Sequence, residues 1–134
     1  MPVYTVTTTR DVVTDEQKAN LAVEITKIHS AVTGAPTSFV HVTFTELPEA
    51  NVFSDGSPSR PLLIEGMTRA GRADSEKIRL AKDISTAAGR VTDIPESRIL
   101  VMILDTPARF AVEGGRILPE PGAEDDWLDE RDSD

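Results

Sequence analysis

The sequence contains no cysteine, and this absence excludes thiol nucleophiles, cysteine-ligated zinc and a disulfide scaffold. No apolar run approaches the roughly 18 residues that a membrane-spanning helix needs. The opening residues, MPVYTVTTTR, lack both the basic region and the apolar region of a secretory signal. Together these absences predict a cytoplasmic protein that has no membrane partner.

Basic charge is also scarce. The formal net charge is −9, and residues 124–134 contribute −6 of it through seven acids and one arginine, which leaves −3 for the rest of the chain. We therefore do not expect nucleic-acid binding, which needs a basic face. The acidic end is predicted to be a solubilising or disordered tail. Asp125 and Asp126 lack the spacing of a calcium loop, and no metal-ligand or phosphate-loop pattern occurs elsewhere.

The chain contains an internal repeat. Its 134 residues suit a single domain over residues 1–134, and a shift of 59 residues brings its two halves into register without a gap. The aligned pairs include Pro2 with Pro61, Thr9 with Thr68, Lys18 with Lys77, Leu21 with Leu80, Val32 with Val91 and Pro36 with Pro95. The repeats span residues 2–48 and 61–107, and a C-terminal hairpin and the acidic tail follow over residues 108–134.

Each repeat is predicted to form a strand, a helix and a second strand. The strands, where β-branched and apolar residues alternate, are residues 3–9, 39–45, 62–67 and 99–104. Thr14 and Gln17 form a capping-box signal for a first helix, which runs to about Thr33 and ends at Gly34. A second helix is predicted over 75–91, with inward positions Ile78, Ala81, Ile84 and Ala88.

Two such units predict an α/β sandwich, in which a four-stranded sheet carries two helices on one face. The other sheet face then needs cover, whether it presents Val40, Val42 and Phe44 or their neighbours on the opposite face. Oligomerisation is the economical way to supply that cover. After the second repeat, Gly114 and Gly115 predict a small hairpin or bulge within residues 110–118.

Pro2 is the first candidate for chemistry. If Met1 is removed, Pro2 becomes an N-terminal secondary amine, and its small side chain suits that removal. The pKa of an α-amino group is about 7.7–8.0, so the group can act as an acid or a base near neutral pH. Burial would lower that pKa, and nearby carboxylates would raise it. The structural alternative is a proline that is merely tolerated at a strand edge.

Three further residues could contact an acidic substrate. His29 shares the apolar stripe of the first helix, where a buried structural histidine is the alternative. Arg69 and Arg72 flank Gly71 at the end of the third strand. Two guanidinium groups can bind a carboxylate through forked hydrogen bonds, although solvated surface arginines would show the same pattern.

Glu113 precedes the glycine pair and could orient or deprotonate water. Arg10 and Arg116 are weaker candidates. His41 is predicted to face away from Val40 and Val42 and receives no role. No nucleophile-elbow pattern of Ser-His-Asp catalysis occurs.

Five motifs carry a family resemblance: PVY at residues 2–4, ITKIH at 25–29, NVF at 51–53, GMTRAGR at 66–72 and VEGGRILPEPG at 112–122. In this order and spacing they resemble cis-3-chloroacrylic acid dehalogenase and its homologues, a fused branch of the tautomerase superfamily. The resemblance covers about residues 2–127. It implies a tautomerase (MIF-like) fold, a homotrimer, a small carboxylate substrate, and no cofactor or metal.

The resemblance also implies residue roles. Pro2 would donate a proton to the substrate α-carbon, and Glu113 would activate the water that adds at the β-carbon. His29, Arg69 and Arg72 would bind and polarise the carboxylate. The result would be hydration or hydrolytic dehalogenation of an unsaturated acid.

The sequence departs from the family pattern at one position. Met102 stands where hydrolytic members of the family carry a tyrosine, and a thioether cannot donate a hydrogen bond to water. Slow dehalogenation is therefore expected. Two other interpretations stay open: a keto-enol tautomerase of 2-oxo acids such as phenylpyruvate, and a non-catalytic trimeric scaffold.

Overall fold

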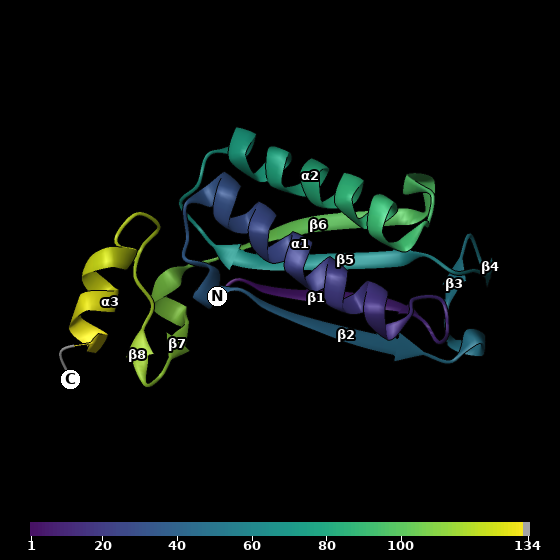
Figure 1. Cartoon of the computed structure of the whole chain (residues 1–134), viewed down its shortest axis with the longest axis horizontal. Helices are drawn as coiled ribbons and strands as arrows, with labels where there is room; N and C mark the ends of the chain where they lie inside the picture. The colour runs from purple at the N-terminus through teal and green to yellow at the C-terminus, as the bar shows by residue number, and fades with distance from the viewer. Residues whose placement is uncertain (133–134) are drawn as a thin grey trace.

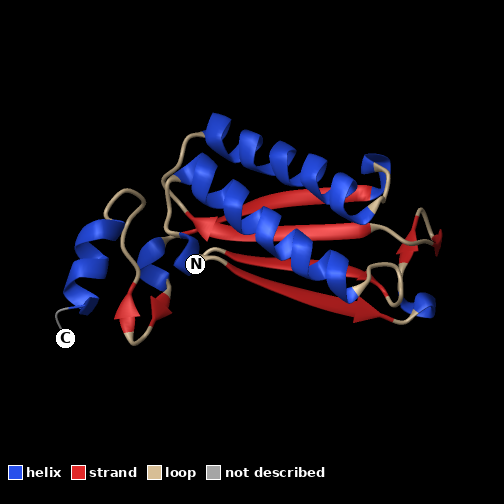
Figure 2. Ribbon diagram, viewed as in Figure 1, coloured by secondary structure: helices blue, strands red, loops and turns tan. Residues whose placement is uncertain are grey.

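The computed structural model describes residues 1–132 and places two long helices on one face of a four-stranded sheet (Figures 1 and 2). The helices are α1 (Asp15–Thr33) and α2 (Asp74–Thr92). The sheet strands are β1 (Val3–Thr9), β2 (His41–Leu47), β5 (Leu62–Arg69) and β6 (Ile99–Thr106). The predicted sandwich of two βαβ units is confirmed.

The strand order is β2-β1-β5-β6. Strands are parallel within each repeat, as a helical crossover requires, and β1 and β5 pair antiparallel where the two repeats meet. The second strand begins at His41 and not at residue 39, because Thr37–Phe39 forms a 3-10 turn whose Phe39 N–H bonds to the Pro36 carbonyl oxygen.

The remaining elements are short. The small strands are β3 (Phe53–Ser54), β4 (Ser57–Pro58), β7 (Val112–Glu113) and β8 (Arg116–Ile117), and a third helix is α3 (Glu124–Asp132). Further 3-10 turns lie at Glu49–Asn51, Glu96–Arg98 and Ala108–Phe110. None of the helices within residues 1–132 has the length and apolar character required to cross a bilayer.

The first helix begins and ends as its sequence predicts. The Gln17 N–H donates to Thr14 Oγ1 over 3.1 Å, and the Thr14 N–H donates to Gln17 Oε1 over 2.9 Å. This reciprocal pair satisfies two N–H groups that the first turn leaves free. At the other end Gly34 adopts φ 77°, a left-handed conformation that glycine reaches without steric cost.

The core lies between the sheet and the helices. Its fully buried side chains come from β1, β5 and both helices: Tyr4, Val6, Leu21, Ile25, Leu62, Ile64, Leu80, Ile84 and Ala88. The inward prediction for Ile78 was wrong, since its side chain is 56% exposed. Leu80 takes the buried position, and residues two apart point about 200° away from each other around a helix.

The other sheet face is open. Val42 and Phe44 pack on the helix side, so their neighbours on the opposite face are the ones that need cover. That open face carries exposed apolar residues of three strands: Val3, Met67, Leu100, Met102 and Leu104.

The C-terminal region extends from one end of the sheet, next to the N-terminus (Figure 1). Strands β7 and β8 form a hairpin whose turn residues, Gly114 and Gly115, have φ 62° and 78°, as a type I′ turn requires. The tail was predicted to be solubilising or disordered, and the disordered alternative was wrong for residues 124–132, which form α3. Trp127 of that helix packs on Phe39, and Glu124 bonds to Arg69, so the helix is held by buried contacts. Residues 133–134 lie outside the described part of the chain.

Candidate active site

The N-terminal amine lies at the sheet end that faces the β7–β8 hairpin (Figure 1). Pro2 is buried and acylated by Met1, so the Met1 ammonium stands in for the amine that Pro2 would carry after Met1 removal. That ammonium lies 3.4 Å from Oε2 of Glu113. Burial lowers its pKa below the usual 8.0, and the charge and hydrogen bond of Glu113 only partly oppose this effect.

Glu113 has two polar partners. Besides the terminal ammonium, Nε2 of His41 donates to its Oε1 over 2.6 Å. Burial raises the pKa of Glu113, but the His41 hydrogen bond and the ammonium outweigh burial, so the net pKa lies below 4.5. Glu113 is therefore ionised at neutral pH and can accept a proton from water.

His29 is fully buried on α1, and its Nδ1 lies 2.8 Å from the Tyr4 hydroxyl. Burial, with the charges of Arg72, Arg69 and the N-terminus, lowers the pKa of His29 to about 3, so the ring is neutral at pH 7. The Tyr4 hydroxyl, whose pKa burial raises, has no other partner within residues 1–132 and donates to Nδ1. The ring proton of His29 consequently sits on Nε2, which becomes a donor.

Gly66 creates the space for this arrangement. A Cβ built on Gly66 would overlap Cε1 of the Tyr4 ring and lie 2.9 Å from its Cδ1. Gly66 stands opposite Tyr4 in the β1–β5 ladder, so the ring lies across the glycine toward α1. The glycine in the GMTRAGR motif thus allows Tyr4 to reach His29.

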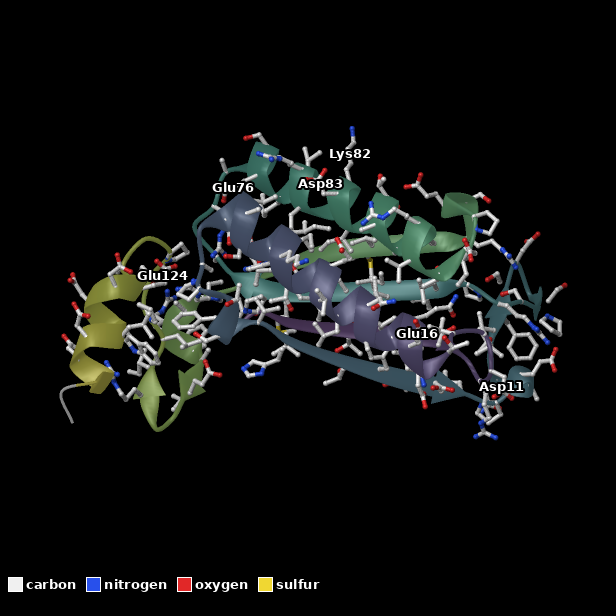
Figure 3. All side chains as sticks on the ribbon, in the orientation of Figure 1. Asp11, Glu16, Glu76, Lys82, Asp83 and Glu124 are labelled. Atoms are coloured by element: carbon white, nitrogen blue, oxygen red, sulfur yellow. The ribbon has the colours of Figure 1, made fainter. Side chains whose placement is uncertain are left out.

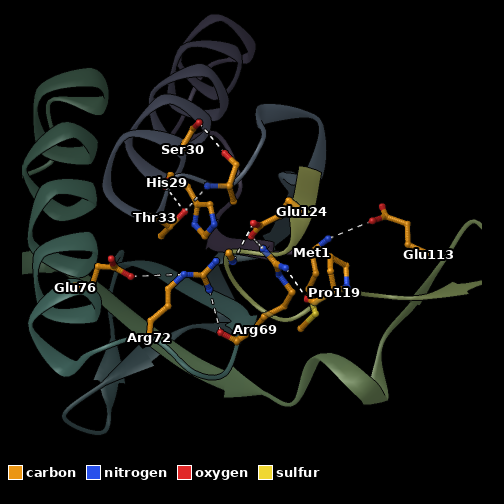
Figure 4. Close-up of polar contacts among 12 residues, drawn as sticks. Met1, His29, Ser30, Thr33, Arg69, Arg72, Glu76, Glu113, Pro119 and Glu124 are labelled. Atoms are coloured by element: carbon orange, nitrogen blue, oxygen red, sulfur yellow. Dashed lines mark hydrogen bonds and ion pairs between the residues drawn. The ribbon is translucent and has the colours of Figure 1, made fainter. Parts of the chain in front are cut away.

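Arg69 is 1% exposed and already bonded within the chain. Its Nη1 donates to the Pro119 carbonyl oxygen over 2.7 Å, and its Nη2 donates to Oε1 of Glu124 over 2.6 Å. Burial raises the pKa of Glu124, but hydrogen bonds from Arg69 and the Gly122 N–H bring the net value below 4.5. Arg69 therefore also fixes the C-terminal region to the sheet (Figure 4).

Arg72 lies beside Arg69 and reaches toward His29 (Figure 4). Its Nη1 donates to the Arg69 carbonyl oxygen over 2.9 Å, and its Nε is 3.7 Å from Glu76. Its remaining nitrogen, Nη2, is buried without a partner within the described chain.

Four buried side-chain nitrogens lack a hydrogen-bond partner in the described residues: Nε2 of His29, Nε of Arg69, Nη2 of Arg72 and Nη1 of Arg116. The first three belong to neighbouring side chains (Figure 4). An unsatisfied buried donor costs roughly 1–3 kcal/mol. The unpartnered nitrogens of His29, Arg69 and Arg72 lie together, and two of them belong to guanidinium groups. Such a group of donors can bind an anionic hydrogen-bond acceptor.

The surroundings of the terminal amine are hollowed and partly apolar. A cavity of about 220 Å³ is lined by Met1, Val3, His41, Ala111, Val112, Glu113 and Leu118. The Met1 side chain packs in a buried apolar cluster with Phe39, Leu118 and Trp127. A larger hollow of about 450 Å³ surrounds Pro61 at the far end of the sheet and contains none of the candidate groups.

The structure gathers the sequence candidates at one end of the sheet. The N-terminus, His29, Arg69, Arg72 and Glu113 lie around the same region, although they span most of the chain (Figure 4). Arg10 does not join them. It follows the other end of β1, near Asp11, which Figure 3 labels at the end of the molecule opposite Glu124.

Arg116 pairs with Glu113 in the β7–β8 ladder, but its Nη2 bonds to the Trp127 carbonyl oxygen and to Glu130. Its Nη1 is buried without a partner in the described residues. Sequence reasoning missed Tyr4, His41 and Glu124. Tyr4 lies in the strand predicted over residues 3–9, but nothing local marks its contact with His29.

Residues 1–132 match a tautomerase family described as "Putative oxalocrotonate tautomerase enzyme". The match spans nearly the whole chain, so the chain belongs to this family. A curated relative, Probable tautomerase LL0574 from Lactococcus lactis subsp. lactis (strain IL1403), is 51% identical over 43 residues, which cover 32% of this chain and 70% of that protein.

Solved structures agree with the family and the fold. N1, a member of the cis-3-chloroacrylic acid dehalogenase family, is 28% identical with a TM-score of 0.93, over 96% of this chain and 91% of N1. The R7 fused 4-OT, solved as an asymmetric trimer, is 30% identical with a TM-score of 0.80, over 87% of this chain and 95% of that one.

Proposed function

We propose that the processed chain, with Pro2 at its N-terminus, is a cofactor-independent enzyme that adds water to a small 3-substituted unsaturated carboxylate. The observation that carries the proposal is the group of three unpartnered buried nitrogens beside the amine. A substrate carboxylate would supply the missing acceptors. In a scaffold that binds no ligand, these buried donors would stay without hydrogen bonds and would destabilise the fold. This disfavours the non-catalytic interpretation.

The hydration step uses two groups. Glu113 accepts a proton from water as the water oxygen bonds to C3 of the substrate, and the ammonium of Pro2 gives a proton to C2 as the double bond is lost. Electron density shifts toward the carboxylate in this step, and His29, Arg69 and Arg72 stabilise that charge. When C3 carries a halogen, the product loses hydrogen halide and becomes an aldehyde acid. Proton transfer from Glu113 to Pro2 restores both groups.

Met102 predicts that this hydration is slow. Its side chain lies on the open sheet face. Tyr4 is the only tyrosine of the sequence, and its hydroxyl is hydrogen-bonded to His29. Glu113 therefore has no phenol partner in its own chain.

Keto-enol tautomerisation of a 2-oxo acid such as phenylpyruvate is the second candidate. It is favoured by the cluster of Phe39, Leu118 and Trp127, because loss of Met1 frees apolar space that an aromatic ring can fill. It also needs a neutral amine, and burial of the terminal amine lowers its pKa in that direction.

A homotrimer is part of the proposal, because the open sheet face is apolar and fused 4-OT relatives are trimers. Light scattering should give about three times the 14.5 kDa chain mass. A mass of one chain at micromolar concentration would refute the trimer.

Glu113→Gln separates the two reactions. The variant should lose at least about a hundredfold in hydration of cis-3-chloroacrylate, because an amide cannot take a proton from water. Phenylpyruvate tautomerisation needs no activated water and should stay within about twofold. If both activities are unchanged, Glu113 is only a turn residue; if both vanish, the division of roles is wrong.

A further inference from the structure

His41 is connected to both groups that the proposed reaction uses. Its backbone N–H donates to the Pro2 carbonyl oxygen over 3.0 Å, and its Nε2 donates to Oε1 of Glu113 over 2.6 Å. The other oxygen of that carboxylate, Oε2, lies 3.4 Å from the terminal ammonium. His41 thus ties the amine-bearing segment to the carboxylate of Glu113, which lies 72 residues away from His41 in sequence.

The fold accounts for this position. His41 is the first residue of β2 and pairs with Val3 in the parallel ladder, so its backbone lies beside the start of the chain. Alternation along β2 turns its side chain to the open sheet face, away from Val42. The type I′ turn of the β7–β8 hairpin presents Glu113 next to that same face.

We propose that His41 is a positioning residue that holds Glu113 in its reactive orientation; this inference rests on the proposed function. The hydrogen bond occupies Oε1 and fixes the carboxylate plane, which leaves Oε2 directed at the Met1 ammonium, the group that stands in for the Pro2 amine. Within the described residues, His41 is the only side chain that donates to Glu113. An imidazole N–H is a donor in both the neutral ring and the imidazolium, so the contact does not require a charged His41.

His41 thus supplies a hydrogen-bond donor to a carboxylate that has no phenol partner in its own chain. Loss of a hydrogen bond to a charged acceptor typically lowers a rate by about ten- to a hundredfold. A residue that only orients the catalytic carboxylate should change kcat much more than KM, because it does not touch the substrate.

Three variants test the contact. His41→Ala removes the donor, His41→Gln restores an N–H at nearly the reach of Nε2, and Thr43→Ala is the matched control on the same exposed face of β2. In hydration of cis-3-chloroacrylate, we expect His41→Ala to lose about ten- to a hundredfold in kcat with little change in KM. His41→Gln should recover to within about threefold of the parent, and Thr43→Ala should match it.

Carbon-13 NMR titration of the Glu113 carboxyl gives a readout that does not depend on turnover. His41→Ala should raise the pKa of Glu113, because a bond to the charged form is lost, and His41→Gln should reverse part of that rise. If hydration is absent even in the parent protein, the proposed function fails, and the titration alone decides whether His41 holds Glu113.

Three results would overturn the inference. Equal losses in His41→Ala and His41→Gln would mean that the ring acts through packing. Equal losses of hydration and phenylpyruvate tautomerisation in His41→Ala would place its effect on Pro2 or on the fold. An unchanged Glu113 titration in His41→Ala would mean that the contact does not exist in solution.

Discussion

The Tyr4 hydroxyl lies 2.8 Å from Nδ1 of His29, and the two rings meet edge-on at 76°. This bond joins the first strand to the first helix and fixes which nitrogen of His29 faces the site. A neutral histidine with Nε2 as donor suits a carboxylate that two arginines already attract, because it adds a hydrogen bond without a third positive charge.

Gly66→Ala should disturb this pair, because its Cβ would overlap the Tyr4 ring. We expect a loss of about 1–3 kcal/mol in unfolding free energy from overpacking. We also expect a fall of about tenfold in kcat/KM as His29 is displaced. Denaturant unfolding and steady-state kinetics would measure the two effects, with Glu65→Ala on the opposite sheet face as the control. Parent-like behaviour in both assays would show that the ring moves aside freely.

Arg69→Ala and Arg72→Ala should differ. Removing Arg69 leaves Glu124 buried without its ion-pair partner, so we expect a loss of about 3 kcal/mol in unfolding free energy as well as of activity. Arg72→Ala should mainly reduce kcat/KM for acid substrates, by about thirty- to a thousandfold.

Kinetics and denaturant unfolding of both variants would separate these effects. Arg79→Ala, which removes a mostly exposed guanidinium from α2, is the control. A stable Arg69→Ala protein would show that Glu124 does not anchor the C-terminal region.

Acid should destabilise the fold through His29. Its pKa is about 3 in the folded chain and near 6.5 when exposed, so the unfolded state binds the extra proton between these values. The contribution of His29 to the free energy of unfolding is complete above about pH 6.5 and falls as the pH drops toward 3. Between pH 7 and pH 5 the loss is about 2 kcal/mol.

In His29→Gln, the unfolding free energy should depend less steeply on pH between pH 7 and pH 5. Unfolding free energies measured at pH 7, 6 and 5 would test this. Equal slopes in the parent and the variant would contradict a buried neutral His29.

The features that could be predicted from the sequence are those marked by local or periodic patterns. The repeat, the capping box at Thr14 and the glycine at Gly34 are local or periodic patterns, and they located the helices and the sheet correctly. Ile78 was misplaced because the apolar residues of α2 allow more than one stripe, and packing against α1 and β6 decides between them.

The candidate site was predicted only in part, because contacts between distant segments leave no local mark. Glu124 was interpreted as one of many tail acids, yet it is buried against Arg69, which lies 55 residues earlier. His41 was correctly placed on the far face of its strand, but its partner Glu113 arrives through a hairpin whose path the sequence does not specify.

If Pro2 acts through a free amine, activity must depend on the state of the N-terminus. Intact mass and kinetics should be measured together for two forms of the chain: the processed form that begins at Pro2, and a form in which an uncleaved residue precedes Pro2. We expect the processed form to be active and the blocked form to lose activity on both substrates, because an acylated nitrogen has no basic lone pair. Full activity in the form whose mass retains a residue before Pro2 would rule out a catalytic Pro2 amine.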